Sequence, residues 1–114
     1  MSIKIVKDTI SRKELKDIAK NQFGDFVKAV VDVEKEIMAI GGELHADEEA
    51  LLLQNGSLQE NLWGINFHTD KSNGDFIEFD SMINIRPSQN NRSRGVESLD
   101  IQRKIKDIIN KLIL

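Results

Sequence analysis

The last seventeen residues constrain the fold most strongly. In "SLDIQRKIKDIINKLIL", apolar side chains recur at helical spacing behind Ser98 as N-cap, with Asp100 near the positive end, which predicts an amphipathic helix. The segment "SRKELKDIAKNQFG" predicts a second helix, with Ser11 and Glu14 as a capping box and Gly24 just past the end. Each helix has to bury an apolar face, so the residues between them must supply a matching surface.

The segment between the helices reads as a series of strands. Alternating, β-branched residues in "FVKAVVDVEKEIMAI" favour two strands that turn near residues 34–36. Two Asn-Gly pairs, in "QNGS" and "SNGD", are typical of tight hairpin turns and predict strands around "ALLLQ", "LWGINFH" and "FIEF". "FDSMINIR" predicts a last strand, ended by Pro87, which has no N–H to donate to a ladder.

These elements predict an α+β fold. An antiparallel β-meander is bracketed by an N-terminal and a C-terminal amphipathic helix, and the helices cover one face of the sheet in a two-layer arrangement. Because the chain has only 114 residues, we expect residues 1–114 to form a single domain.

Composition excludes several classes of site. The chain has no cysteine, so it has no disulfides, thiolate metal sites or thiol nucleophiles. No apolar run resembles a signal peptide or a membrane span, so we expect a cytoplasmic protein with no membrane partner.

Residues 25–84 carry thirteen acidic and three basic side chains, whereas residues 85–114 carry seven basic and three acidic ones. Basic ends that neutralise an acidic middle, or a basic face offered to an anion, are both consistent with this pattern.

The run "GGELHADEEALLL" gathers an imidazole with carboxylates. If the run is extended, His45, Asp47 and Glu49 alternate onto one face, and if it is helical, His45 and Glu49 still approach each other. We therefore treat these three residues as candidate catalytic residues, with His68 as an alternative base and Glu48 as an alternative carboxylate partner. The competing interpretation is a hydrogen-bonded structural histidine. No metal-binding spacing and no nucleotide-binding or nucleophile-elbow motif is present, so no metal and no cofactor are expected.

The loop "INIRPSQNNRSRG" is the candidate ligand-binding segment. Arg86, Arg92 and Arg94 bring planar guanidinium groups and Asn91 adds an amide, an inventory that suits a phosphate or a carboxylate. The alternative is that the asparagines form turns while the arginines pair with the acidic middle. Trp63 most simply fills the core, with ligand stacking as a second possibility. Few aromatic residues are available for base stacking, so a nucleic-acid partner is possible but not favoured.

Several of these segments also resemble a known family. The runs "VVDVEKEIMAIGGELHADEEALLLQNGS", "LWGIN" and "INIRPSQNNRSRG" are similar to a prokaryotic domain-of-unknown-function family, number 5674, over nearly the whole chain. The resemblance implies no activity, cofactor or catalytic residue, because the family has none assigned. It does imply a glycine as the usual third residue of the turn that reads "EKE" in this chain, where Glu36 stands.

Three functions remain open from the sequence. The first is a binding domain that holds an anionic small molecule, or a nucleic-acid phosphate, through the arginine loop. The second is a small hydrolase-like enzyme that uses the histidine and carboxylate cluster. The third is a structural protein, such as a homodimer joined through sheet edges or the C-terminal helix. The most informative observation is whether His45 and the arginine loop converge on one cavity, because the enzyme hypothesis mostly falls if they lie on opposite faces.

Overall fold

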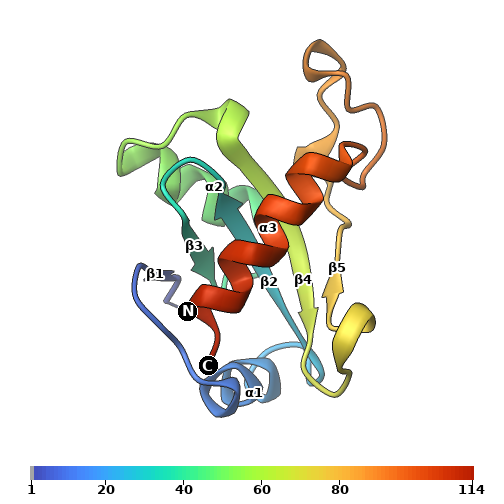
Figure 1. Ribbon diagram of the computed structural model, residues 1–114. Helices are drawn as coiled ribbons and strands as arrows, with labels where there is room; N and C mark the ends of the chain where they lie inside the picture. Colours follow the sequence, from blue (N-terminus) through green and yellow to red (C-terminus); the bar gives the residue numbers. More distant parts are fainter. Residues whose placement is uncertain (1) are drawn as a thin grey trace.

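The structure, a computed structural model, describes residues 2–114 and has an α+β fold built on a five-stranded antiparallel sheet (Figure 1). Its order is β1-β3-β2-β4-β5. The elements are β1 (Lys4–Val6), α1 (Arg12–Lys20), β2 (Phe26–Asp32), β3 (Ile37–Ile40), α2 (His45–Gln54), β4 (Leu62–His68), β5 (Ile77–Glu78) and α3 (Leu99–Leu112). The predicted fold class, an antiparallel sheet bracketed by two terminal helices, is confirmed.

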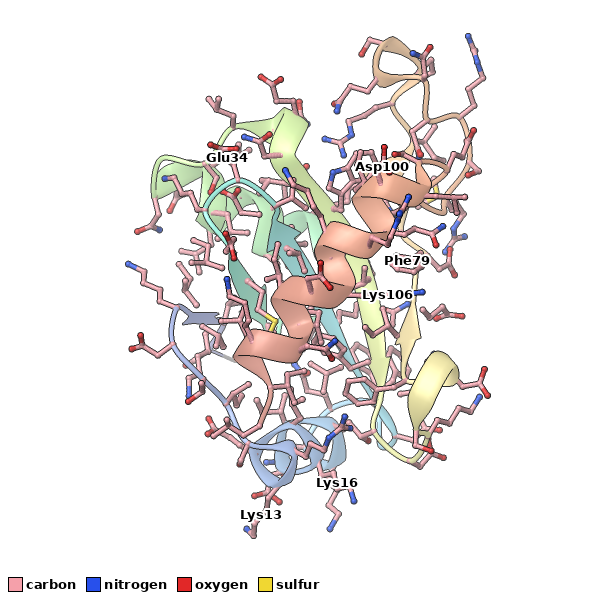
Figure 2. All side chains as sticks on the ribbon, in the orientation of Figure 1. Lys13, Lys16, Glu34, Phe79, Asp100 and Lys106 are labelled. Carbon is pink, nitrogen blue, oxygen red and sulfur yellow. The ribbon has the colours of Figure 1, made fainter. Side chains whose placement is uncertain are left out.

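Both terminal helices begin where the sequence predicts. The Ser11 hydroxyl accepts the Glu14 N–H at 3.1 Å, and the Ser98 hydroxyl accepts a backbone N–H of the first turn of α3. Gly24 follows α1 with a φ of +96°, a conformation that glycine adopts without a steric cost. Lys13 and Lys16 of α1 point away from the sheet (Figure 2). Within residues 2–114, no helix is both long and apolar enough to cross a bilayer.

The apolar faces of α1 and α3 cover one side of the sheet. The strands contribute alternate residues to this core because successive side chains point to opposite faces. Its buried members include Leu15, Ala19, Val27, Ala29, Val31, Trp63, Ile65, Phe67, Ile105, Ile108 and Ile109. Backbone hydrogen bonds from Ile10 to Leu112 and from Leu114 to Ile10 then fasten the end of α3 beside the start of α1.

The opposite side of the sheet is partly covered by α2, which the strand prediction missed. Val30, Ala39, Leu52 and Leu62 form a small second core there. Because α2 carries the chain from β3 across this face, β4 pairs with β2 and not with β3, so the strand order departs from a simple meander at this point.

The strand predicted around "ALLLQ" is wrong, since these residues belong to α2 (His45–Gln54). The open question of helix or strand over residues 46–54 is thus answered as helix. Asn55 and Gly56 end this helix and do not form a hairpin: Gly56 has a φ of +97°, and the Ser57 N–H donates to the Leu52 carbonyl at 3.0 Å. A glycine with positive φ serves a helix end and a type I′ turn equally well, which is why the local pattern misled.

The predicted hairpin between β2 and β3 is confirmed. Asp32 is fully buried, and its Oδ1 accepts the N–H groups of Glu34 and Lys35, both at 2.9 Å. Its Oδ2 accepts the Ser57 hydroxyl at 2.6 Å, which ties this turn to the segment after α2. Glu36, where the family resemblance implies glycine, has a φ of +57°.

The second Asn-Gly pair also does not form a two-residue turn. Asn73–Asp75 is a 3₁₀ turn inside a longer connection between β4 and β5, although both strands lie where "LWGINFH" and "FIEF" predict them. Phe79 leaves the sheet after β5 and lies beside Lys106 of α3 (Figure 2).

The last predicted strand, "FDSMINIR", is wrong. Met82–Asn84 is a 3₁₀ turn, and Pro87 starts a further 3₁₀ turn, Pro87–Gln89, where the sequence predicted the end of a strand. Arg86 and Asn91 close that turn through two backbone hydrogen bonds, Arg86 N–H to Asn91 O at 2.7 Å and Asn91 N–H to Arg86 O at 3.2 Å. The alternation of apolar residues did not reveal that this segment crosses over β4.

A single side chain replaces the missing strand. Asn84 is fully buried; its Oδ1 accepts the Gly64 N–H at 2.8 Å, and its Nδ2 donates to the Gly64 carbonyl at 2.9 Å. This amide therefore occupies the position at the edge of β4 that a neighbouring strand's backbone would take. Gly64 is required there, since a Cβ on it would lie 2.5 Å from the Ser81 Cβ.

Candidate functional site

A concavity lined by both polar and apolar side chains lies on the α2 side of the sheet, at the end that α2 leaves uncovered. It has a volume of about 420 Å³. It is bounded by the start of α2, the start of β2, the ends of β4 and β5, and residues 80–83. We refer to it as the His45 cleft. It is lined by Phe26, Lys28, Leu44, His45, Ala46, Asn66, His68, Glu78, Asp80, Ser81, Met82, Ile83 and Arg94.

The floor of the cleft is formed by polar side chains that alternate onto one face of the sheet. Lys28 of β2 pairs with Asn66 of β4, which in turn pairs with Glu78 of β5, and His68 lies two residues beyond Asn66 on the same face. Their neighbours, such as Ile65, point into the apolar core on the other side. The sheet is thus apolar on one face and polar at this end of the other.

A hydrogen-bond network joins the floor of the cleft. The Asn66 Nδ2 donates to Glu78 Oε1 at 2.9 Å and to the Asp80 carbonyl at 3.3 Å, and His68 Nε2 donates to Glu78 Oε1 at 3.1 Å. The bond from Asn66 lowers the pKa of Glu78 below its ordinary value, with a smaller contribution from His68. Glu78 therefore remains a carboxylate at neutral pH.

His45 is held at the first position of α2. Its Nε2 lies 2.9 Å from the carbonyl oxygen of Ile65, and because a carbonyl only accepts, Nε2 carries the proton. Burial lowers the pKa of His45 below 6.5; Lys28 adds to the lowering, while Ile65, Asn66 and Asp80 oppose it. At neutral pH the ring is therefore uncharged, with Nδ1 free to accept a proton.

Two cations complete the cleft. Arg94 Nε donates to Asp80 Oδ1 at 2.7 Å, and the Arg94 side chain remains 56% exposed. Lys28 forms no ion pair with any carboxylate of residues 2–114, and its ammonium lies 5.4 Å from the Phe23 ring centre. An anion entering the cleft meets one unneutralised ammonium and one guanidinium with its terminal nitrogens available.

Of the three predicted catalytic residues, only His45 lies in the cleft. Asp47 lines a separate shallow depression together with residues 2 and 3, and Glu49 lies close enough to Arg86 to interact with it electrostatically. The structure therefore does not bring these two carboxylates to the imidazole, and the acids near His45 are Glu78 and Asp80. Within residues 2–114, no three histidine or acidic side chains are arranged to hold a metal ion.

Arg86 and Trp63 contact each other away from the cleft. The Arg86 guanidinium lies 4.2 Å from the centre of the Trp63 ring, and it donates to the carbonyls of Gln59 and Leu62, the latter at 2.6 Å. Trp63 is only 2% exposed. Burial lowers the pKa of Arg86, with Glu49 opposing the shift. The pair fastens the loop to the start of β4: Trp63 fills the core, whereas Arg86 bonds to backbone carbonyls in place of the carboxylates that the alternative interpretation expected.

Asn91 and Arg92 lie outside the cleft as well. Asn91 is 2% exposed, its Nδ2 donates to the carbonyls of Asn84 and Gly95, and its Oδ1 accepts the Glu97 N–H. The Arg92 side chain is exposed, and its backbone N–H donates to Glu97. Asn91 thus shapes the loop, and of the three loop arginines only Arg94 lines the cleft with His45.

The sequence interpretation missed Lys28, Asn66, Glu78 and Asp80. The available signal was polar residues inside apolar strands: Lys28 in "FVKAVVD" and Asn66 in "LWGINFH" each interrupt a segment that otherwise reads as buried. Combining them required the pairing of β2 with β4, which no local pattern specifies.

Comparison with known proteins gives one family. A family model described as "Protein of unknown function (DUF5674)" matches residues 4–112. No curated protein and no solved structure matches.

Proposed function

We propose that this chain, which belongs to the family described as Protein of unknown function (DUF5674), binds a small anionic ligand in the His45 cleft. The ligand is held through a phosphate or carboxylate group. The observation that carries the proposal is that Lys28 and Arg94, from β2 and from the arginine loop, line the same cavity as His45. A concave, partly apolar site with a few convergent polar groups is the usual form of a small-molecule site.

Charge in the cleft favours a single negative charge on the ligand. Arg94 is already paired with Asp80, and the charge of Glu78 is shared between hydrogen bonds from Asn66 and His68. Lys28 is the cation left without a carboxylate among the described residues. A monoanion therefore gains the attraction of Lys28 without a strong repulsion from the two acids.

The start of α2 adds to this attraction. Leu44, at the N-cap position, offers no side-chain acceptor to the first turn, and Leu44, His45 and Ala46 all line the cleft. Free N–H groups at a helix N-terminus favour an anion. Leu44 and Met82, which are 56% and 65% exposed, place apolar side chains at the rim, so the ligand is expected to carry an apolar part as well.

Binding of dimethyl phosphate and of acetate, followed by NMR titration of the backbone amides, tests the proposal. In the wild-type protein, the amide resonances of residues in the cleft are expected to shift on addition of either probe. Binding is expected to weaken at higher salt. K28M and R94Q each remove one charged hydrogen bond, worth about 1.5–3 kcal/mol, so each is expected to weaken binding roughly tenfold or more.

The matched control is R92Q, which makes the same chemical change as R94Q in the same loop but outside the cleft. It is expected to bind as wild type does. Equal weakening in R92Q and R94Q would indicate general attraction by the loop, and an absence of shifts with both probes would refute the proposal.

A further inference from the structure

The side-chain oxygen of Asn66 is a buried hydrogen-bond acceptor without a donor. The residue is 8% exposed, it lines the His45 cleft, and its Oδ1 has no hydrogen-bond partner, whereas its Nδ2 is bonded twice. A buried oxygen of this kind normally binds water or a ligand donor, because leaving it unpaired costs about 1–3 kcal/mol.

His45 supplies a second acceptor beside it. The Nε2 proton is fixed on the carbonyl of Ile65, the residue that precedes Asn66 in β4, so Nδ1 holds a lone pair. A side-chain hydrogen bond from Asn66 raises the pKa of His45, which places the amide next to the imidazole, although the geometry leaves Asn66 Oδ1 without a well-aligned donor. A water molecule has two protons, and Asn66 Oδ1 and His45 Nδ1 are two acceptors for them.

We propose that the His45 cleft hydrolyses a phosphate diester, with His45 as the general base that takes a proton from a water oriented by Asn66. This inference rests on the proposed function, since Lys28 and Arg94 hold the phosphate. A diester carries one negative charge, which matches the charge balance of the cleft, and the two cations stabilise the charge that develops on the phosphate oxygens.

The reaction balances without a further reactant. The water oxygen forms a bond to phosphorus as its proton passes to His45 Nδ1, and the bond from phosphorus to the leaving oxygen breaks with its electron pair on that oxygen. The leaving oxygen takes up a proton from the imidazolium form of His68, whose Nε2–H is held by Glu78 and whose Nδ1 is the donor in this step. The products are a phosphate monoester and an alcohol, and both imidazoles return to their starting states by exchange with solvent.

Bis(p-nitrophenyl) phosphate, a diester, and p-nitrophenyl phosphate, a monoester, are the two probes. Wild type is expected to release p-nitrophenol faster from the diester. H45Q is expected to lower kcat/KM by about 10²–10⁴-fold, as for loss of a general base, while binding of dimethyl phosphate is retained. N66A is expected to lower kcat more than it changes KM. R92Q, purified in the same way, is expected to keep wild-type activity.

The leaving group separates the roles of the two histidines. p-Nitrophenolate departs without a proton, so H68Q is expected to lose much more kcat/KM on cytidine 2′,3′-cyclic phosphate, whose leaving group is an alkoxide, than on bis(p-nitrophenyl) phosphate. H45Q is expected to be slow on both. On bis(p-nitrophenyl) phosphate, which needs no general acid, the rate of wild type is expected to rise with pH around the pKa of His45, which Lys28, Asn66 and Asp80 influence, and to level off above it.

The outcomes separate this inference from the proposed function. If dimethyl phosphate binds and neither diester is hydrolysed, the hydrolysis is refuted and the binding function stands. Wild-type kcat/KM in H45Q also refutes it, and so does preference for the monoester. If neither binding nor hydrolysis occurs, both proposals fail. Intrinsic Trp63 fluorescence of each variant verifies folding, because Trp63 is buried in the main core.

Discussion

Glu48 is expected to make the free energy of unfolding fall as the pH rises, and replacing it by glutamine is expected to remove this pH dependence. Glu48 is fully buried on the sheet side of α2, where its Oε2 accepts the Gly42 N–H at 2.9 Å and its Oε1 has no partner. Burial raises its pKa to about 9; Asp47 adds to the rise, while the Gly42 N–H and Lys28 oppose it. At neutral pH the native chain therefore holds Glu48 as a neutral acid.

The size of the effect follows from proton linkage. From the ordinary pKa of 4.5 up to about 9, the native chain keeps a proton that the unfolded chain has released. The stabilisation is complete below the unfolded pKa, and the free energy of unfolding then falls by roughly 1.4 kcal/mol per pH unit. By pH 7 the loss amounts to about 3 kcal/mol. Glutamine is neutral at every pH, so E48Q avoids this loss while its amide oxygen still accepts from Gly42.

Urea unfolding followed by Trp63 fluorescence, in steps from about pH 5.5 to about pH 8.5, measures this difference. The free energy of unfolding of E48Q minus that of wild type is expected to grow steadily with pH. E43Q is the matched control, because Glu43 is an exposed carboxylate in the same segment, and its curve is expected to run parallel to wild type. A parallel curve for E48Q would refute the assignment of a neutral buried acid.

Three further substitutions test the fold. G64A places a Cβ 2.5 Å from that of Ser81 and is expected to lower the free energy of unfolding by about 1–3 kcal/mol; an unchanged thermal midpoint would contradict the close approach. E36G relieves a φ of +57°, so it is expected to be about 1 kcal/mol more stable in urea than E36A, which removes the same side chain without relief; equal midpoints would argue against strain. R86M loses bonds to two carbonyls and the contact with Trp63, so a loss of about 2–4 kcal/mol and altered fluorescence are expected; full rescue by R86K would exclude the planar contact.

Local signals predicted the parts of the fold that depend on nearby residues. Ser11 and Ser98 cap the helices because a hydroxyl two or three residues before an N–H is within reach of it whatever the rest of the chain does. Gly56 shows where such signals end. Its positive φ suits a helix end as well as a hairpin, and the burial of Leu52 against the sheet decided for the helix.

The candidate site was predictable only in part. His45 and Arg94 stood out by residue type, and the structure brings them to one cleft. Asp47 was grouped with His45 by sequence spacing, yet the first turn of α2 directs the two side chains to different surfaces. Lys28 and Asn66 are 38 positions apart in the sequence and become neighbours only through the register of β2 with β4, a long-range property that residue types do not encode.

The amide of Asn84 also affects how the molecule behaves in a crowded solution. β5 pairs with β4 at Asn66 and Phe67. The part of the same β4 edge that precedes these residues would therefore present unpaired backbone groups to any extended chain nearby. By accepting from and donating to Gly64, Asn84 closes that edge with one side chain. One potential position for intermolecular strand addition is thereby blocked at the border of the sheet nearest the cleft.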